Sequence, residues 1–246
     1  MGPGVPGRYG AVPVTRSTSE TDAASRRVHP TPRARRFDED PERRLLRAVG
    51  DAVANHGYAA TTVNHIVALA HVSKRTFYER YAGKAECFLE SYRRGSDLLN
   101  RRLLAAGMAA TGPCDLRLRL AMRGYLSVLV EYPASTRTFT LEILSAGPEA
   151  LELRREKHRR TAATFSELVD DIRRTDPTVR PLSAMQADAM VGAITELILN
   201  GVAAGRATDL MDLDVPVVEL FMALLTAPPR PLTPLASAAE GAEHQT

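Results

Sequence analysis

The chain has 246 residues, of which 44% are hydrophobic and 25% charged, and its formal net charge is +3; this length suits one large or two small domains. Two cysteines cannot form a disulfide framework, so we expect a reduced, cytoplasmic protein. We expect neither a signal peptide nor a membrane span, because no apolar run is long enough.

Basic side chains are concentrated toward the N-terminus. Seven arginines and five acidic residues precede residue 41, and residues 41–96 carry nine basic against five acidic side chains. This asymmetry suits a nucleic-acid-binding head on a mildly acidic body. Residues 1–40 lack apolar periodicity and predict a disordered, Arg-rich arm. Such an arm could reach a DNA minor groove, although a merely solubilising tail is an equally good interpretation.

An amphipathic helix is predicted from about Pro41 to His56. Its apolar residues recur at helical spacing: Leu45, Leu46, Val49, Ala52 and Val53. Gly57 follows where a helix end favours a residue with positive φ. This helix can cover the apolar side of the two helices that come next.

Residues 61–72 predict a short helix and a tight turn. Thr61 and Thr62 are adjacent N-cap candidates, because a side-chain oxygen there can accept from a free backbone N–H. An apolar stripe follows at helical spacing: Val63, Ile66, Val67 and Ala70. The chain then turns at His71-Val72.

Residues 74–80 predict a second helix, which is basic. Ser73 is its N-cap candidate, and Phe77 and Tyr81 are four apart, so they can pack inward together. The residues left facing outward are Lys74, Arg75 and Tyr78. Two helices joined by a short turn, the second exposed and basic, form a helix-turn-helix. A basic helix alone is more often a solvated face, but the surrounding pattern favours DNA binding.

The segment from Gly57 to Lys84 resembles the N-terminal domain of the tetracycline-repressor (TetR/AcrR) family of transcriptional regulators, and the resemblance covers roughly residues 41–95. The residues that carry it are Gly57-Tyr58, Thr61-Thr62-Val63, Ile66, Ala70, Val72-Ser73, Thr76, Tyr78, Tyr81 and Lys84. Three positions depart from the family pattern. His71 stands where the family usually has Gly, His65 where a Glu would complete a capping box, and Tyr81 where Phe is more usual.

The resemblance implies a role for each matched position on double-stranded operator DNA. Tyr78 and Lys84 would contact phosphates, and Thr62 would cap its helix and also meet the DNA backbone. The residues facing base edges in the major groove, or lying beside them, would be Asn64, Ser73, Lys74, Arg75 and Thr76. The operator sequence stays open.

Catalytic and metal sites are not expected. His56, His65 and His71 do not match the usual spacing of metal ligands, and no cysteine lies nearby. The chain shows no convergent nucleophile, base or phosphate-binding loop, and it implies no cofactor. A redox pair of Cys87 and Cys114 is a minor alternative. Two other classes stay open: a helical enzyme, and a non-catalytic adaptor that reuses the head without reading DNA.

The rest of the chain predicts helices and no convincing strand, so the expected fold class is all-α. The predicted helices cover residues 84–109, 115–131, 134–145, 149–174, 183–204 and 216–226, with a disordered tail over 227–246. We expect a helix-turn-helix head over residues 41–95 and an effector-binding and dimerisation domain over residues 96–226.

The last two predicted helices are apolar on more than one face, which is typical of buried or interface helices. By the resemblance they would form a homodimer, so that two heads read successive major grooves of a palindrome. The resemblance also implies a pocket for a small-molecule effector. Its candidate residues are Met122, Tyr125, Phe139, Glu142, Glu196 and Asn200. The apolar members are more often ordinary core, and Glu196 could instead lie at the rim of the dimer interface.

Overall fold

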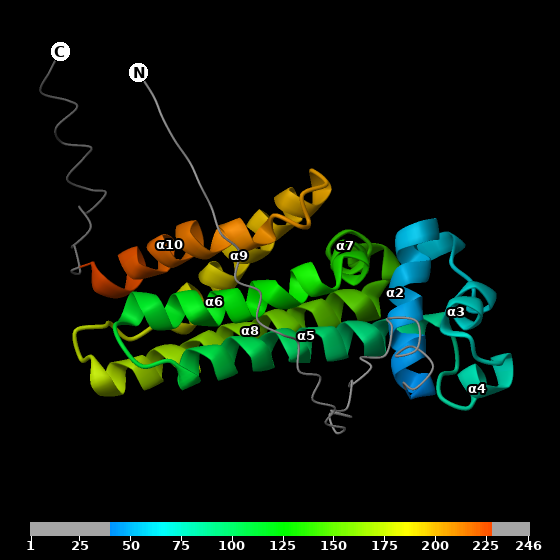
Figure 1. The fold of residues 1–246 in the computed structure, drawn as a ribbon, viewed down its shortest axis with the longest axis horizontal. Coiled ribbons are helices and arrows are strands. Elements are labelled where there is room, and N and C mark those ends of the chain that lie inside the picture. Colours follow the sequence, from blue (N-terminus) through cyan, green and yellow to red (C-terminus); the bar gives the residue numbers. More distant parts are fainter. Residues whose placement is uncertain (1–39, 228–246) are drawn as a thin grey trace, which may run out of the picture. The chain divides into compact units, whose positions relative to one another are not determined.

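The computed structural model describes residues 40–227, and within that range the chain is built of helices and turns without any strand (Figure 1). The fold class is all-α. The predicted arm over residues 1–40 and tail over residues 227–246 lie outside the described residues, apart from Asp40 and Ala227 at their inner ends. None of the helices in the described range is long and apolar enough to cross a membrane.

The helices follow one another with short connections. In chain order they are α2 (Pro41–Ala60), α3 (Val63–Ala70), α4 (Lys74–Tyr78), α5 (Lys84–Ala109), α6 (Cys114–Glu131), α7 (Pro133–Leu141), α8 (Pro148–Thr175), α9 (Ala184–Ala203) and α10 (Asp214–Thr226), with the 3₁₀ turns η1 (Ile143–Ala146) and η2 (Leu210–Leu213). The predicted helix over 84–109 is confirmed at both ends. The predicted helix over 134–145 is in fact α7 followed by η1, and η2 was not predicted.

The buried apolar residues form two clusters. The head core consists of Leu45, Leu46, Ala48, Val49, Ala52, Val53, Ile66, Ala70, Phe77, Tyr81, Cys87, Phe88, Ile143 and Ala150. The body core lies among α5, α6, α8, α9 and α10, and the long helices α5, α6 and α8 run side by side there (Figure 1). The head core takes two of its residues, Ile143 and Ala150, from beyond α5, because three short helices bury too little surface by themselves.

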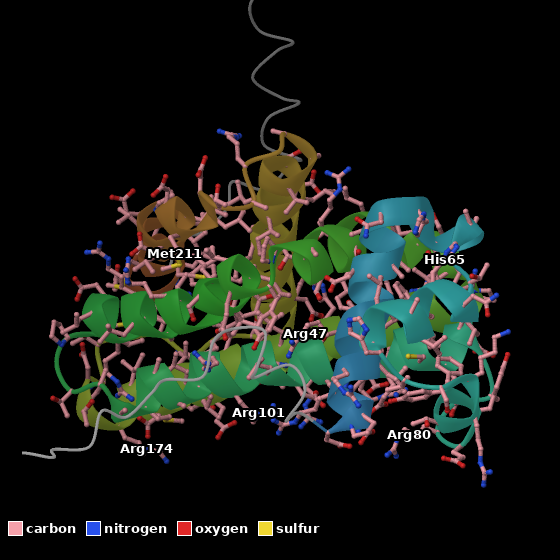
Figure 2. All side chains as sticks on the ribbon, turned by 45° about the vertical axis from the view of Figure 1, so that its right-hand side comes forward. Arg47, His65, Arg80, Arg101, Arg174 and Met211 are labelled. Carbon is pink, nitrogen blue, oxygen red and sulfur yellow. The ribbon has the colours of Figure 1, made fainter. Side chains whose placement is uncertain are left out.

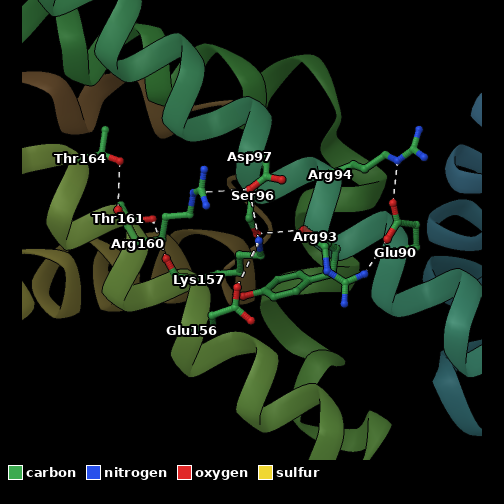
Figure 3. A network of polar contacts seen from close by, with 11 residues as sticks. Glu90, Arg93, Arg94, Ser96, Asp97, Glu156, Lys157, Arg160, Thr161 and Thr164 are labelled. Carbon is green, nitrogen blue, oxygen red and sulfur yellow. Dashed lines mark hydrogen bonds and ion pairs between the residues drawn. The ribbon is translucent and has the colours of Figure 1, made fainter.

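Polar contacts fix the long helices of the body against one another. Lys157 on α8 is buried, and its Nζ lies 3.2 Å from the Asp97 carboxylate on α5 (Figure 3). Arg117 on α6, also buried, donates through Nε to the Gly107 carbonyl at 3.1 Å and pairs with Asp171 on α8. Removing one partner of such a pair would leave a buried charge without compensation.

The head is joined to α7 by a close backbone approach. Thr138 Oγ1 on α7 donates to the Gly50 carbonyl on α2 at 2.9 Å. A Cβ at Gly50 would lie 2.8 Å from Ser135 Oγ, so glycine allows α7 to pack this near. The Tyr58 amide donates to a Glu142 carboxylate oxygen at 3.2 Å. These contacts tie the position of α2 to that of α7.

Candidate nucleic-acid interface

The first helix of the head ends where the sequence predicts. Gly57 has φ 75° and ψ 159°, and this positive φ breaks α2 one residue after His56. The two adjacent threonines that follow have different roles. Thr61 Oγ1 donates to the Gly57 carbonyl at 2.7 Å, whereas Thr62 Oγ1 accepts from the His65 amide at 3.3 Å and so caps α3. The exposed Thr62 hydroxyl keeps its hydrogen available for a second partner.

The turn between α3 and α4 depends on His71. This residue has φ 53° and ψ 47°, and among residues 40–227 no other non-glycine residue has positive φ. Histidine enters this region more readily than most residues, although at a cost. Arg44 Nη1 on α2 donates to the His71 carbonyl at 3.4 Å, which holds the turn against the first helix. His71 thus adopts the left-handed conformation that glycine reaches most easily.

The second helix of the motif is short. Ser73 Oγ caps α4 by accepting from the Thr76 amide at 3.0 Å, and it also lies 2.9 Å from Thr76 Oγ1. The helix ends at Tyr78, two residues earlier than predicted, because the Arg80 amide bonds the Phe77 carbonyl at 3.0 Å in a tighter turn. Phe77 is fully buried, which anchors α4 to the head core.

The opposite face of α4 is open to solvent. Lys74 and Arg75 are exposed, and Tyr78 is 56% exposed. Arg75 Nε pairs with Glu79 at 2.9 Å, but its side chain is 89% exposed. Such surface pairs contribute only about 0–1 kcal/mol, so the guanidinium can leave Glu79 for a stronger partner. Arg80 and His65 lie at the α3–α4 end of the molecule in Figure 2.

Lys84, the first residue of α5, has protein partners in this structure. Its Nζ donates to the carbonyls of Tyr58 and Ala59 at 2.8 and 3.2 Å and lies 4.6 Å from the centre of the Tyr58 ring. The ammonium thereby satisfies carbonyls at the end of α2, as basic residues commonly do there. An ammonium has three donors, so one remains for the phosphate contact predicted from the sequence.

The histidines and cysteines within residues 40–227 form no metal-binding cluster. The rings of His56 and His65 stack with centres 4.3 Å apart, and within residues 40–227 no group of three His, Cys, Asp or Glu side chains could hold a metal ion. Cys87 lies in the head core and Cys114 in the body core. Burial raises the pKa of the Cys87 thiol to about 12 and that of Cys114 to about 11, so both stay protonated and poorly nucleophilic.

The six predicted effector-pocket residues do not gather at one place. Met122 is fully buried in the body core, and Tyr125 packs against that core. Phe139 packs against the head core instead, with its ring centre 5.3 Å from that of Phe88. Glu142 binds the Tyr58 amide and lines a cavity of about 190 Å³ beside α2 and α7.

The expectation that Glu196 and Asn200 aim into a cavity is corrected. Both are exposed on α9, where Asn200 Nδ2 donates to the Glu196 carboxylate at 3.3 Å. The helix is apolar almost all round, so the sequence could not show which face is buried.

Two buried polar groups were missed. Asn100 on α5 is only 6% exposed, and neither its amide nitrogen nor its amide oxygen has a partner. The Tyr81 hydroxyl in the head is likewise buried and without a partner. Buried polar atoms nearly always have a hydrogen-bond partner, so both groups indicate places that another molecule, water included, can occupy. The signal for Asn100 was an amide between Leu99 and Leu103 on an apolar helix face.

Comparison with known proteins places these features in a family. Residues 48–91 match the family model for bacterial regulatory proteins of the tetR family. No curated protein matches the chain. The match covers α3, α4 and the turn between them, together with most of α2 and the start of α5.

Solved structures share the fold over most of their length. The fatty acid degradation regulator FadR from Bacillus halodurans is 18% identical, with a TM-score of 0.66 over 74% of this chain and 98% of its own. FadR from Bacillus subtilis, in complex with stearoyl-CoA, is 17% identical, with a TM-score of 0.63 over 72% and 96%. A tetR-family regulatory protein from Rhodococcus RHA1 is 22% identical, with a TM-score of 0.55 over 78% and 100%. The capped helix-turn-helix thus lies in a segment that matches the tetR family of bacterial regulatory proteins, and the chain as a whole shares the fold of these solved structures.

Proposed function

We propose that the chain is a dimeric repressor that binds a palindromic DNA operator and leaves or gains it in response to a small molecule. The observation that carries the DNA-binding part is the geometry of α4. Its buried side is fixed by Phe77, while Lys74, Arg75 and Tyr78 project together into solvent. This is the arrangement that a helix needs to enter the major groove.

Each exposed residue then has a distinct task. Arg75 pairs bidentately with guanine, and Lys74 donates to the same kind of acceptor. Tyr78 donates from its hydroxyl to a phosphate, and Thr62 and the third Lys84 donor hold the backbone on either side. Thr76 lies beside the groove with its hydroxyl against Ser73, so it reads a base only after that contact opens.

Apolar surface on the last two helices supports the dimer. Leu197 on α9 and Leu220 on α10 remain 38% and 44% exposed, although the opposite faces of both helices are in the body core. A Cβ at Gly192 would meet nothing within 4 Å, so another helix can approach α9 closely there. A second copy of the chain covers this surface and sets two α4 helices at groove spacing.

The effector contacts the body core at Asn100. The NH₂ group and the carbonyl oxygen of this buried amide are used by no protein group, and α5, which carries it, packs against α6, which carries Met122 and Tyr125. The structural relative from Bacillus subtilis is in complex with stearoyl-CoA, which makes acyl-CoA compounds the first to test.

The DNA-binding proposal is tested by removing one hydroxyl group, that of Tyr78, and measuring operator affinity. Bound sites are first selected from random DNA, and the affinity of the best site is measured by fluorescence anisotropy. Tyr78→Phe keeps the edge-on contact with Phe77, whose ring centre is 5.4 Å away, and removes only the phosphate donor. Hydrogen bonds to charged groups contribute about 1.5–3 kcal/mol, so we expect about tenfold weaker binding or more.

The control is another exposed tyrosine. Tyr132→Phe changes a residue that is 37% exposed between α6 and α7, and it should leave operator affinity unchanged. Equal affinity of Tyr78→Phe and the unaltered chain would contradict the proposed interface. An adaptor that does not read DNA would select no sequence and lack the steep loss of binding with salt that counterion release produces.

A further inference from the structure

A groove in the head lies apart from the face of α4 that is proposed to read DNA. It has a volume of about 510 Å³, which is within the usual range for small-molecule sites. Its lining comes from the start of α2, the segment between α4 and α5, the first turns of α5 and the start of α8: Glu42, Tyr81, Ala82, Gly83, Ala85, Glu86, Leu89, Glu90, Arg93 and Glu149.

Negative charge dominates this lining, and part of it is uncompensated. Glu90 pairs with Arg93 at 2.5 Å and with Arg94 at 2.8 Å, as Figure 3 shows, and Arg94 also pairs with Glu42. Among residues 40–227 no basic side chain forms an ion pair with Glu86 or Glu149, although one Glu86 oxygen accepts from the Ala82 amide at 2.6 Å. The groove therefore has a net charge of −2, because four carboxylates face only the two guanidinium groups of Arg93 and Arg94.

The Tyr81 hydroxyl provides a second, independent sign of a ligand. Tyr81 lines the groove and is 5% exposed, and its hydroxyl has no hydrogen-bond partner. Burial raises the pKa of this phenol, and the nearby Cys87, Glu42 and Glu90 raise it further, so the hydroxyl stays protonated within a negative field. Phenylalanine, the more usual residue of the family at this position, would leave no such group.

The residues that line the groove favour an organic cation over a metal ion. No three carboxylates of the described residues converge closely enough to hold a metal ion. Glu86 and Glu149 enter the lining from two different helices, and the lining also carries the apolar side chains of Leu89 and Ala85. This combination suits two ammonium groups joined by a short alkyl chain. We propose that this groove binds a linear aliphatic diamine, with one ammonium near Glu149, the other near Glu86, and the Tyr81 hydroxyl accepting a hydrogen bond.

The binding test uses the full chain without DNA, so it does not depend on the proposed function. Isothermal titration calorimetry with 1,4-diaminobutane should show saturable binding of one molecule per chain. Tyr81→Phe should weaken it about tenfold, as expected for losing a hydrogen bond to a charged group. Glu149→Gln should weaken it by up to about fivefold, as expected for losing an exposed ion pair.

Matched controls separate this site from general attraction of cations. Glu152→Gln changes an exposed acid three residues along the same helix, outside the groove, and should leave the affinity unchanged. 1-Aminobutane should bind at least tenfold more weakly than the diamine. Equal binding of the monoamine, equally tight binding of Mg²⁺, or full affinity in Tyr81→Phe would each overturn the proposal.

Folding of the key variant is checked by urea denaturation. Because the Tyr81 hydroxyl has no protein partner, Tyr81→Phe should be as stable as the unaltered chain or more stable when no ligand is added. A clear loss of stability would show that the hydroxyl already has a partner inside the protein, and the argument for a ligand would fail.

Discussion

The left-handed turn at His71 allows the backbone strain of the motif to be measured. At φ 53° and ψ 47° a Cβ crowds the backbone, which costs roughly 1–2 kcal/mol for a residue other than glycine. Glycine has no Cβ, but it loses about 0.4–1 kcal/mol more conformational entropy on folding than alanine does. The two effects together predict that glycine is favoured over alanine at position 71 by about 0.5–1 kcal/mol.

Two variants separate the strain from the loss of the imidazole. His71→Ala removes the imidazole and keeps the Cβ, whereas His71→Gly removes both. The difference in stability between the two variants therefore measures the cost of a Cβ at this positive φ. The backbone bond from Arg44 to the carbonyl at position 71 is available in both variants. The assay is urea denaturation followed by circular dichroism at one fixed protein concentration, because association would otherwise shift the midpoint.

The expected order of stability is His71→Gly above His71→Ala. For a domain of this size the difference corresponds to roughly 1–4 °C in Tm. An alanine variant as stable as the glycine variant would refute the inferred strain. Operator affinity measured on the same two proteins shows whether relaxing the turn also changes how α4 is presented.

Three further predictions follow from buried and exposed groups elsewhere. Leu220→Glu should shift the sedimentation coefficient from that of a dimer to that of a monomer, because it places a charge on the proposed interface. The control Leu144→Glu changes a residue that is 61% exposed on η1 and should leave the sedimentation coefficient unchanged. Burial raises the pKa of Asp214, but hydrogen bonds from two arginines outweigh this effect and lower the pKa below its usual value. The ionised carboxylate therefore adds stability above about pH 4, and this stability is lost as the pH falls further. Asp214→Asn should remove this pH-dependent stability, whereas Asp212→Asn, at an exposed residue, should leave it unchanged. Asn100→Leu should raise the midpoint of urea denaturation without ligand, because an unpartnered buried amide disappears, and an effector that uses this amide should bind more weakly.

Features set by neighbouring residues were predictable from the sequence. The Ser73 cap, the positive φ of Gly57 and the packing of Phe77 each depend on a few adjacent side chains, and all three are confirmed. The local chemistry could not separate Thr61 from Thr62 as the cap, because both are threonines and the choice depends on where α2 ends; the family resemblance pointed to Thr62, which is the cap.

Features set by packing were not predictable. Phe139 has the same local pattern whether it packs against the head or against the body, and its contact with Phe88 depends on how α7 crosses α2 and α5. The face of α9 that carries Glu196 is another example, since apolar residues surround that helix. The unpartnered amide of Asn100 has no local signature beyond one polar residue in an apolar stripe.

The head core has a practical consequence for building chimeric regulators. Phe88 and Tyr92 on α5 pack against Phe139, and Ile143 and Ala150 belong to the same cluster. A fragment that stops near residue 95 would expose these aromatic rings to water and should aggregate or unfold. A chimera that joins this DNA-binding domain to another effector-binding domain therefore needs the α7–η1 segment and the start of α8 as well. Otherwise the other domain must supply equivalent apolar residues to cover Phe88 and Tyr92.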